Sequence, residues 1–265
     1  MISQPKKKTT ARSARAPAVV FEPLTPQPAY RRVSTVIEQR ILRRHLRQGD
    51  SLPTETELAR QFAVNRSTVR EALRRLESAG LVGRIGGGKR LIVTRPAAAE
   101  TASRVSRALV LDDVTVTELW EAMLAIAPRV AALAARNATT ADAQRMAAIT
   151  DVVDAARTGD AAIDAIVEFF GVLAALSGNR VLILAMQPVT RLLAPSLRRM
   201  LDRVSQSRSR IVVAQRCIIE ALRTQNVQEA ESWMTRHVQD FRRGYELAGI
   251  SLDSRAAAAT EGDAS

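Results

Sequence analysis

A run of hydrogen-bond donors opens one short amphipathic stretch in the first third of the chain. It consists of Asn65, Arg66, Ser67 and Thr68, followed after one residue by Arg70. At the first turn of a helix, side-chain guanidinium, hydroxyl and amide groups add to the free backbone N–H groups. That combination suits DNA phosphates and the acceptor edges of bases in a major groove. The other interpretation is the solvated polar end of an ordinary helical hairpin.

The flanking sequence predicts a scaffold that would hold these donors in place. Apolar residues recur at helical spacing over 30–47 and over 54–79, where a turn at 63–65 divides two helices. Gly80 is placed to end the second helix in the left-handed conformation. Two short apolar runs within 81–93 enclose a glycine-rich basic tip and predict a β-hairpin. The donors would thus lie on the second helix of a helix-turn-helix that is followed by a hairpin.

Charge is distributed unevenly along the chain. Residues 1–100 hold 20 Lys and Arg against 8 Asp and Glu, so the net charge of +12 lies there and the remainder is balanced. A basic module joined to a neutral one indicates that the first part meets a polyanion. Because Cys217 is the single cysteine, an intrachain disulfide and a zinc finger are excluded. With only His45 and His237, a histidine-rich metal site is not expected.

Composition narrows the class of protein further. Aromatic residues make up 3% of the chain, and the abundance of Ala, Leu and Arg favours helices over a sheet sandwich. No apolar run approaches the roughly 20 residues that span a bilayer, so we expect no membrane partner, and the single cysteine fits a reducing, cytoplasmic location. The sequence offers no paired catalytic carboxylates beside a nucleophile and no phosphate loop, so we do not expect an enzyme.

An ordered set of motifs covers residues 30–95. It comprises Tyr30–Val33, Leu52–Glu55, the long run Val64–Leu73, Leu76, Ala79–Val82 and Gly87. With these motifs the segment resembles the winged helix-turn-helix domain of the GntR family of bacterial transcription regulators. The resemblance implies that the start of the second helix contacts DNA and that the 86–90 tip enters the minor groove. The predicted DNA contacts are Arg31, Thr54, Arg60, Asn65, Arg66, Ser67, Thr68, Arg70, Gly87, Lys89 and Arg90.

One position departs from the family pattern. The family usually has arginine where this chain has Thr56, so one usual contact is missing. Arg60 and the wing cations Lys89 and Arg90 are the candidates to compensate for it.

A second set of shorter motifs covers residues 114–248. It comprises Glu118–Glu121 with Pro128, Phe169–Phe170, Ser177–Asn179, Ile219–Leu222, and Ala230, Met234 and His237. With these motifs the segment resembles the effector domain of the FadR branch of the same family, the FCD-type domain. Such domains are six- or seven-helix bundles that dimerise the repressor and hold a small molecule in the bundle core.

The metal site of that branch is not preserved. Most members bind a divalent metal through an Asp and three His, and these positions correspond here to Ile166, Phe170, Gln215 and His237. One imidazole cannot hold such a metal against water. We therefore expect no metal and no cofactor, against the majority of the family.

Apolar replacement of the metal ligands allows two interpretations. Either the pocket has collapsed into core, since Met and Phe at helical spacing usually pack, or it accepts an apolar chain. The second interpretation follows the fatty-acyl-responsive repressor that gave the branch its name. The candidate pocket residues are Met123, Ile126, Ile166, Phe170, Asn179, Met186, Gln215 and His237. We expect His237 to be a buried, hydrogen-bonded remnant of the site.

The expected organisation is mainly α, with a winged helix-turn-helix domain before an all-α six- or seven-helix bundle. The segments are a disordered basic arm (1–29), the DNA-binding domain (30–96), a linker that starts a helix (97–113), the helical effector and dimerisation domain (114–250) and a disordered tail (251–265). The arm is either a solvated tail or a flexible addition to the DNA contacts. Within the bundle, Pro188 and Pro195 are expected to kink or split the helix predicted over 179–203.

Together these features predict a ligand-responsive transcription regulator, most simply a repressor. It would bind the half-sites of a palindromic operator in double-stranded DNA as a homodimer. A fatty acid or an acyl-CoA is the effector that the resemblance suggests. The alternative is a non-specific architectural DNA-binding protein whose helical domain only dimerises.

Overall fold

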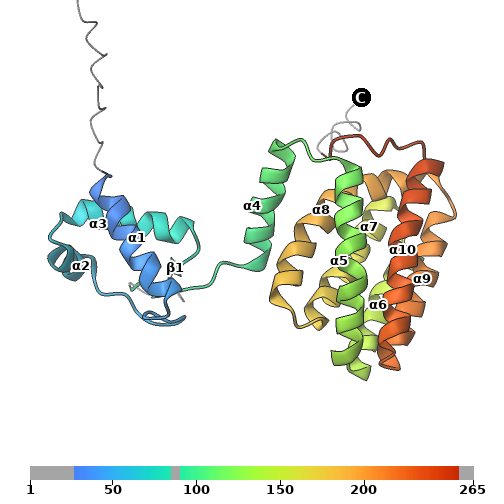
Figure 1. The fold of residues 1–265 in the computed structure, drawn as a ribbon, viewed down its shortest axis with the longest axis horizontal. Helices are drawn as coiled ribbons and strands as arrows, with labels where there is room; N and C mark the ends of the chain where they lie inside the picture. Colours follow the sequence, from blue (N-terminus) through green and yellow to red (C-terminus); the bar gives the residue numbers. More distant parts are fainter. Residues whose placement is uncertain (1–26, 85–89, 257–265) are drawn as a thin grey trace, which may run out of the picture. The chain divides into compact units, whose positions relative to one another are not determined.

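The computed structural model describes residues 27–84 and 90–256. Within these ranges the chain forms ten helices and one pair of short antiparallel strands, which confirms the mainly helical fold class (Figure 1). The chain divides into two compact units, Met1–Arg95 and Pro96–Ser265. Among the described helices, none has the length and apolar character needed to cross a bilayer.

The first unit is built on three helices, α1 (Ala29–Leu42), α2 (Glu55–Phe62) and α3 (Arg66–Ser78). Their apolar faces meet in one core that includes Val33, Ile37, Leu58, Val69, Leu73 and Leu76. Local signals set the helix ends. The Thr54 hydroxyl accepts a hydrogen bond from the Glu57 N–H at 3.2 Å and so caps the start of α2. Gly80, with φ of 72°, follows the end of α3 in the predicted left-handed conformation. Ala63, with φ of 51°, makes the sharp turn between α2 and α3.

A short hairpin follows α3. Strands β1 (Val82–Gly83) and β2 (Ile92–Val93) pair antiparallel, with Val82 opposite Val93. The Thr94 hydroxyl donates to the Gly80 carbonyl at 2.9 Å and ties the second strand to the end of α3. The predicted basic tip, with Gly87 and Lys89, lies outside the described residues.

The second unit contains seven described helices. They are α4 (Ala98–Leu111), α5 (Val116–Asn137), α6 (Thr140–Ala155), α7 (Gly159–Leu176), α8 (Arg180–Arg203), α9 (Ser207–Arg223) and α10 (Val227–Leu247). Helix α10 packs against α5 and α9, while α7 packs against α6 and α8. A capping box of Thr115 and Glu118 starts α5, and its hydrogen bonds hold the pKa of Glu118 below the ordinary value.

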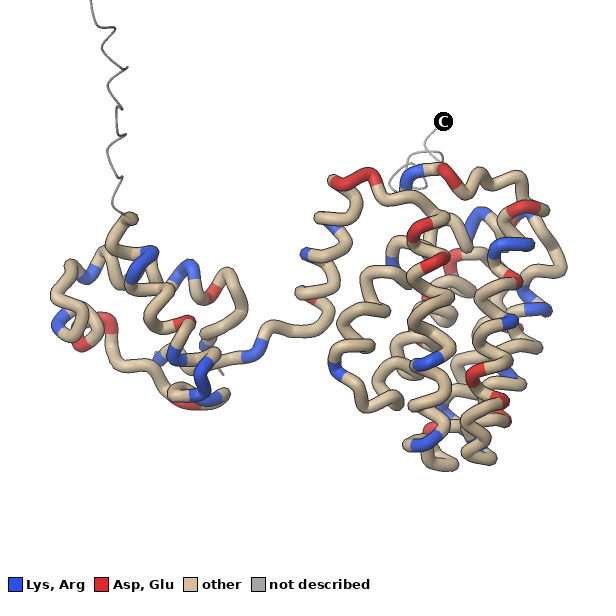
Figure 2. Tube along the Cα trace, viewed as in Figure 1, with Lys and Arg blue, Asp and Glu red and all other residues tan. Residues whose placement is uncertain are grey.

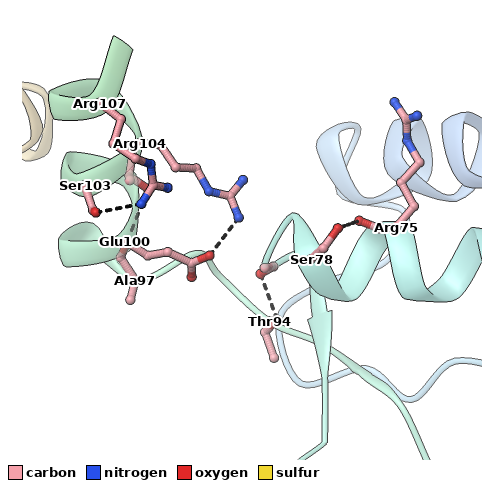
Figure 3. A network of polar contacts seen from close by, with 10 residues as sticks. Arg75, Ser78, Thr94, Ala97, Glu100, Ser103, Arg104 and Arg107 are labelled. Atoms are coloured by element: carbon pink, nitrogen blue, oxygen red, sulfur yellow. Dashed lines mark hydrogen bonds and ion pairs between the residues drawn. The ribbon is translucent and has the colours of Figure 1, made fainter. Parts of the chain in front are cut away.

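Helix α4 occupies most of the segment 97–113, which the sequence predicts to be a linker that starts a helix. It packs along α8, with Ala102 fully buried and Arg191 Nη1 donating to the Ala99 carbonyl at 3.3 Å. On its polar side Arg104 pairs with Glu100 at 2.7 Å (Figure 3). The alanines that suggest a spacer in the sequence are small enough to let α4 approach α8 closely.

Helix α8 runs through both of its prolines, so of the two predicted effects, a kink or a split, the split does not occur. Pro188 and Pro195 lie seven residues apart inside one continuous helix, Arg180–Arg203. Contacts of α8 with α4, α5 and α7 hold the helix together across the two missing N–H donors. Packing thus overrides the local effect of proline on helix formation.

The first residues of the predicted disordered tail are ordered. The Val116 N–H donates to the Ser254 carbonyl at 3.0 Å, the Ala256 N–H donates to the Val114 carbonyl at 2.8 Å, and Ala256 is buried. Residues 251–256 therefore lie against the start of α5, where they pair with its backbone. Residues 257–265 are outside the described part.

Candidate nucleic-acid interface and effector site

The donor-rich start of α3 is exposed because the opposite face of the helix is buried in the core. Val69 and Leu73 are buried, whereas Arg66, Ser67 and Arg70 are exposed. The 3.6-residue period of the apolar positions therefore fixes which side chains face solvent. Figure 2 shows Lys and Arg positions along α1, α2 and α3, so the donors belong to a generally basic unit.

The backbone at the start of α3 adds to these donors. Asn65 occupies the N-cap position, and within the described residues its side chain makes no capping hydrogen bond. The N–H groups of the first turn are therefore not satisfied by the cap, and the helix dipole places partial positive charge there. An exposed helix start of this kind binds phosphate groups.

Arg70 is held in place by a carboxylate from the neighbouring helix. Its Nη2 lies 3.0 Å from Oε2 of Glu55, and its Nε lies 3.3 Å from the same oxygen. This hydrogen bonding raises the pKa of Arg70. Two guanidinium nitrogens on one carboxylate restrict the side chain, so Arg70 is oriented before any partner arrives. The role of Glu55 as the partner of Arg70 could not be predicted from the sequence, because a pairing across 15 residues leaves no local signal.

The other predicted DNA contacts lie on different elements of the same unit. Arg31 on α1, Arg60 on α2 and Arg90 before β2 are exposed. Arg31 Nε donates to the Tyr30 hydroxyl at 3.1 Å. The Thr54 hydroxyl is the N-cap of α2, so it already accepts one hydrogen bond.

Most of the predicted pocket residues in the helical unit pack as core. Met123 of α5, Ile166 and Phe170 of α7 and Met186 of α8 are at most 2% exposed and belong to one apolar cluster, with Ile126 partly buried against it. The rings of Phe170 and His237 are stacked, with centroids 5.9 Å apart. The His237 ring also meets Phe241, at 4.6 Å.

Asn179 does not join this group. It is exposed at the start of α8, where its side-chain oxygen accepts the Val181 and Leu182 N–H groups. Its role in the structure is a helix N-cap.

Gln215 and His237 are buried in the bundle, and each carries polar atoms that have no hydrogen-bond partner within the described residues. Gln215 of α9 is completely buried, and neither its Oε1 nor its Nε2 has a hydrogen-bond partner within 27–84 and 90–256. His237 of α10 is buried as expected, yet its Nε2 likewise has none, so the expectation of a hydrogen-bonded remnant was wrong for that atom. Burial lowers the pKa of His237 to about 4, so the imidazole is neutral at pH 7.

The donor set does not fit the divalent metal that the resemblance implies. Ile166 and Phe170 carry no ligating atom, a carboxamide is a weak substitute for imidazole, and His237 alone remains. In the part of the chain that the structure covers, no three His, Cys, Asp or Glu side chains are grouped so that they could hold a metal.

A groove of about 350 Å³ lies along the junction of α9 and α10, beside His237. Its walls include Val213 and Ala214 of α9 and Trp233 and His237 of α10. Among the described residues that were predicted for the pocket, His237 is the one that lines this groove. The other residues of the groove could not be predicted from the sequence, because their helical spacing resembles that of any surface helix.

Comparison with known proteins fits both units. Residues 29–89 match the model of bacterial regulatory proteins of the gntR family, and residues 118–240 match the FCD domain. The chain is 36% identical over 166 residues to the uncharacterized HTH-type transcriptional regulator Rv0494 of Mycobacterium tuberculosis, covering 62% of this chain and 67% of that protein. It is 31% identical over 173 residues to the HTH-type transcriptional repressor NanR of Citrobacter rodentium, covering 62% and 66%.

A solved structure extends the likeness to both units. Streptococcus agalactiae GntR has a TM-score of 0.55 and 28% identity to this protein, and the match covers 81% of this chain and 99% of that one. The chain spans about two thirds of the length of each of the two relatives named above. On these matches, and on the exposed donor-rich helix and the helical bundle, the chain belongs to the gntR family of bacterial regulatory proteins and carries an FCD domain.

Proposed function

We propose that this protein is a sequence-specific DNA-binding repressor of the FadR branch of the family. Two copies related by a two-fold axis would place their α3 helices in the half-sites of a palindromic operator. The observation that carries the proposal is the start of α3, where Arg66 and Ser67 are exposed while Val69 is buried. The proposed DNA contacts are Arg31, Thr54, Arg60, Asn65, Arg66, Ser67, Thr68, Arg70, Gly87, Lys89 and Arg90.

Control by an effector completes the proposed function. A small apolar molecule would bind in the FCD domain and favour one geometry of the dimer over another. A difference of about 1–3 kcal/mol between the two geometries is enough to release the operator. A lipid-like effector, such as a fatty acid or an acyl-CoA, is suggested by the apolar residues Ile166 and Phe170, which stand in the sequence at the positions of the family's metal ligands.

Replacement of Arg66 by alanine tests the DNA interface. We expect operator affinity to fall by about 1–3 kcal/mol, roughly 5- to 150-fold, with relaxed sequence preference, if Arg66 contacts a base. The measurement is fluorescence anisotropy with an operator selected from random duplexes and with point variants of it.

Arg75→Ala is the matched control for Arg66→Ala. It removes one charge from an exposed arginine of the same helix, at the opposite end of α3. Operator binding by Arg66→Ala that equals that of Arg75→Ala would contradict the proposed interface.

Competition with bulk DNA separates the regulator from an architectural protein. A regulator keeps its operator in the presence of excess unrelated duplex, since specific binding is typically at least 10³-fold tighter. Loss of the operator complex at equal mass of competitor would favour the architectural alternative.

Removal of the Glu55–Arg70 ion pair is predicted to lower the preference for the operator and to raise the affinity for unrelated DNA. Glu55→Gln removes a negative charge from the proposed DNA face and frees the Arg70 side chain. We expect affinity for unrelated duplex to rise, because less charge repels phosphate, and the preference for the operator to fall by about two- to fivefold.

Anisotropy with both duplexes at several salt concentrations measures this effect. Glu57→Gln, which removes the same charge from another exposed position of α2, is the control. An unchanged operator preference in Glu55→Gln would show that the ion pair does not orient Arg70 for recognition.

A further inference from the structure

Four arginines gather where α1 ends, in a part of the first unit that the proposed function does not use. Arg40 lies in the last turn of α1, Arg43 is its C-cap, and Arg44 and Arg47 follow in the next turn (Figure 2). All four side chains are exposed. No carboxylate within 27–84 and 90–256 lies at ion-pair distance from any of them. The end of α1 therefore presents positive charge that the described part of the chain does not neutralise.

The turn after α1 folds back over the end of the helix and forms a hollow. The N–H groups of His45 and Leu46 both donate to the Arg40 carbonyl, at 2.9 and 3.1 Å. The hollow has a volume of about 420 Å³ and is lined by Val36, Gln39, Arg40, Arg43 and His45. Guanidinium and carboxamide groups are hydrogen-bond donors, and hydrogen bonds from guanidinium to phosphate are among the strong ones. The hollow therefore suits the oxygen atoms of a phosphate group.

This basic surface and the start of α3 lie on opposite sides of the same core. Helix α1 packs against α3 through its buried side, which carries Val33 and Ile37. Gln39 and Arg43 lie on the other side of α1, and Arg66 is exposed on the side of α3 that faces away from the core. A duplex bound at the start of α3 therefore leaves the surface at the end of α1 free.

Local structure does not account for the four charges. The helix dipole favours cations within the last turn, which explains Arg40 but not Arg47. Arg44 has φ of 60°, a left-handed conformation for which glycine is the usual residue after a helix. Like charges three or four residues apart also repel one another on a helix. Because neither the helix nor the turn gains from the cluster, a polyanionic partner is its best explanation.

We propose that the surface formed by Arg40, Arg43, Arg44 and Arg47 binds the phosphate backbone of a second DNA duplex while α3 holds the operator. The charges extend over the end of the helix and the whole turn, and each DNA strand carries one phosphate per about 3.4 Å of helix axis. Contacts to phosphate carry no sequence information, so the second duplex can have any sequence. The protein would thus hold two DNA segments together. The proposed operator binding is needed only for the first of the two duplexes.

Sequential binding of two duplexes tests the surface. An operator duplex is immobilised on a sensor and saturated with the full-length protein, and an unrelated duplex is then added. Salt is kept at about 50 mM, because phosphate contacts weaken steeply as salt rises. We expect the second duplex to bind only where protein is present, and its affinity to fall as salt is added. A saturated sensor that takes up no second duplex would overturn the proposal.

A double variant connects the second duplex to the named arginines. Arg43→Gln with Arg47→Gln should weaken binding of the second duplex at least about tenfold and reduce the slope of log affinity against log salt by about two. Operator affinity at about 0.15 M salt should change less than about twofold, because exposed charges are screened beyond about 8 Å. The matched control is Arg129→Gln with Arg136→Gln, at exposed positions of α5. Equal binding of the second duplex by the two double variants would remove the arginines from the site.

Arg44→Gly separates the charge from the fold. Glycine adopts the left-handed conformation without a Cβ penalty, so Tm should stay unchanged or rise, while binding of the second duplex weakens. If the arginine served the turn alone, the variant would bind the second duplex as the unaltered protein does, and the proposal would fail.

The remaining outcomes distinguish this surface from the proposed repressor. Loss of operator binding in the Arg43→Gln, Arg47→Gln protein would assign the arginines to the operator interface, which overturns the second surface and leaves the repressor. If the unaltered protein binds no operator, the repressor is rejected, and anisotropy of an unrelated duplex with the two double variants still tests the surface. Capture of polyglutamate in preference to the second duplex would indicate an acidic protein partner and overturn the proposal.

Discussion

Replacing Phe170 with alanine is expected to lower the free energy of unfolding of the helical unit by about 3–5 kcal/mol. The Phe170 ring is 1% exposed and packs against Phe169, His237 and Phe241, with centroid distances of 5.9, 5.9 and 6.3 Å. Its removal would leave a void inside a close-packed cluster, and the cost then includes both the lost transfer energy and the cavity. If the side chain instead lined open space, only part of the transfer term would be lost, about 2 kcal/mol or less.

Urea unfolding followed by tryptophan fluorescence measures this cost in the helical unit alone. Both tryptophans of the chain, Trp120 and Trp233, belong to that unit. Phe169→Ala is the comparison, because Phe169 is equally buried on the same helix. Similar losses in the two variants indicate that the predicted cavity has become core. A loss in Phe170→Ala well below that in Phe169→Ala would indicate that Phe170 borders a cavity.

Lowering the pH from 7 to 4 is expected to cost the helical unit about 3 kcal/mol through His237 alone. Burial depresses its pKa from 6.5 to about 4. Between these values the unfolded chain binds a proton that the folded chain does not, so stability falls as the pH falls through this window and is constant above it. The groove places the side chains of Arg210, Arg236 and Asp240 near His237.

The His237→Phe variant isolates this contribution. Phenylalanine preserves the aromatic contacts with Phe170 and Phe241 but cannot take up a proton. Carboxylates with lowered pKa values, such as Glu118 and Asp142, also lose stability as the pH falls below the ordinary pKa of a carboxyl group, but they do so equally in both proteins. The difference in unfolding free energy between the two proteins should therefore change by about 3 kcal/mol from pH 7 to pH 4. A constant difference would show that His237 takes up a proton in the folded state as readily as in the unfolded state, so that its pKa is not lowered.

The helix-turn-helix could be predicted from the sequence because its determinants are local. The apolar period over 66–78 turns Val69 and Leu73 inward and Arg66 outward. Gly80 ends the helix because it adopts a left-handed conformation without a Cβ penalty. The helix predicted over 179–203 likewise lies within one residue of its observed bounds, Arg180–Arg203.

The elements that the sequence misjudged depend on contacts between distant residues. Proline predicts a break in α8 because it lacks an N–H, but packing against three neighbouring helices keeps the helix continuous. The segment 97–113 is alanine-rich and predicts a linker that starts a helix, whereas its contact with α8 makes α4 part of the bundle. Residues 251–256 are part of a segment whose small and polar residues predict disorder, yet their backbone forms hydrogen bonds with the backbone at the start of α5.

By itself the sequence determined which helix carries the donors and which of its faces is free, since propensity, capping and apolar period act within a few residues. Only the tertiary structure decided that Glu55 holds Arg70, that Phe170 is core, and that Gln215 and His237 are buried without partners. Burial and pairing of this kind depend on side chains far apart in the chain, and the free energy of a buried polar atom depends on everything that surrounds it.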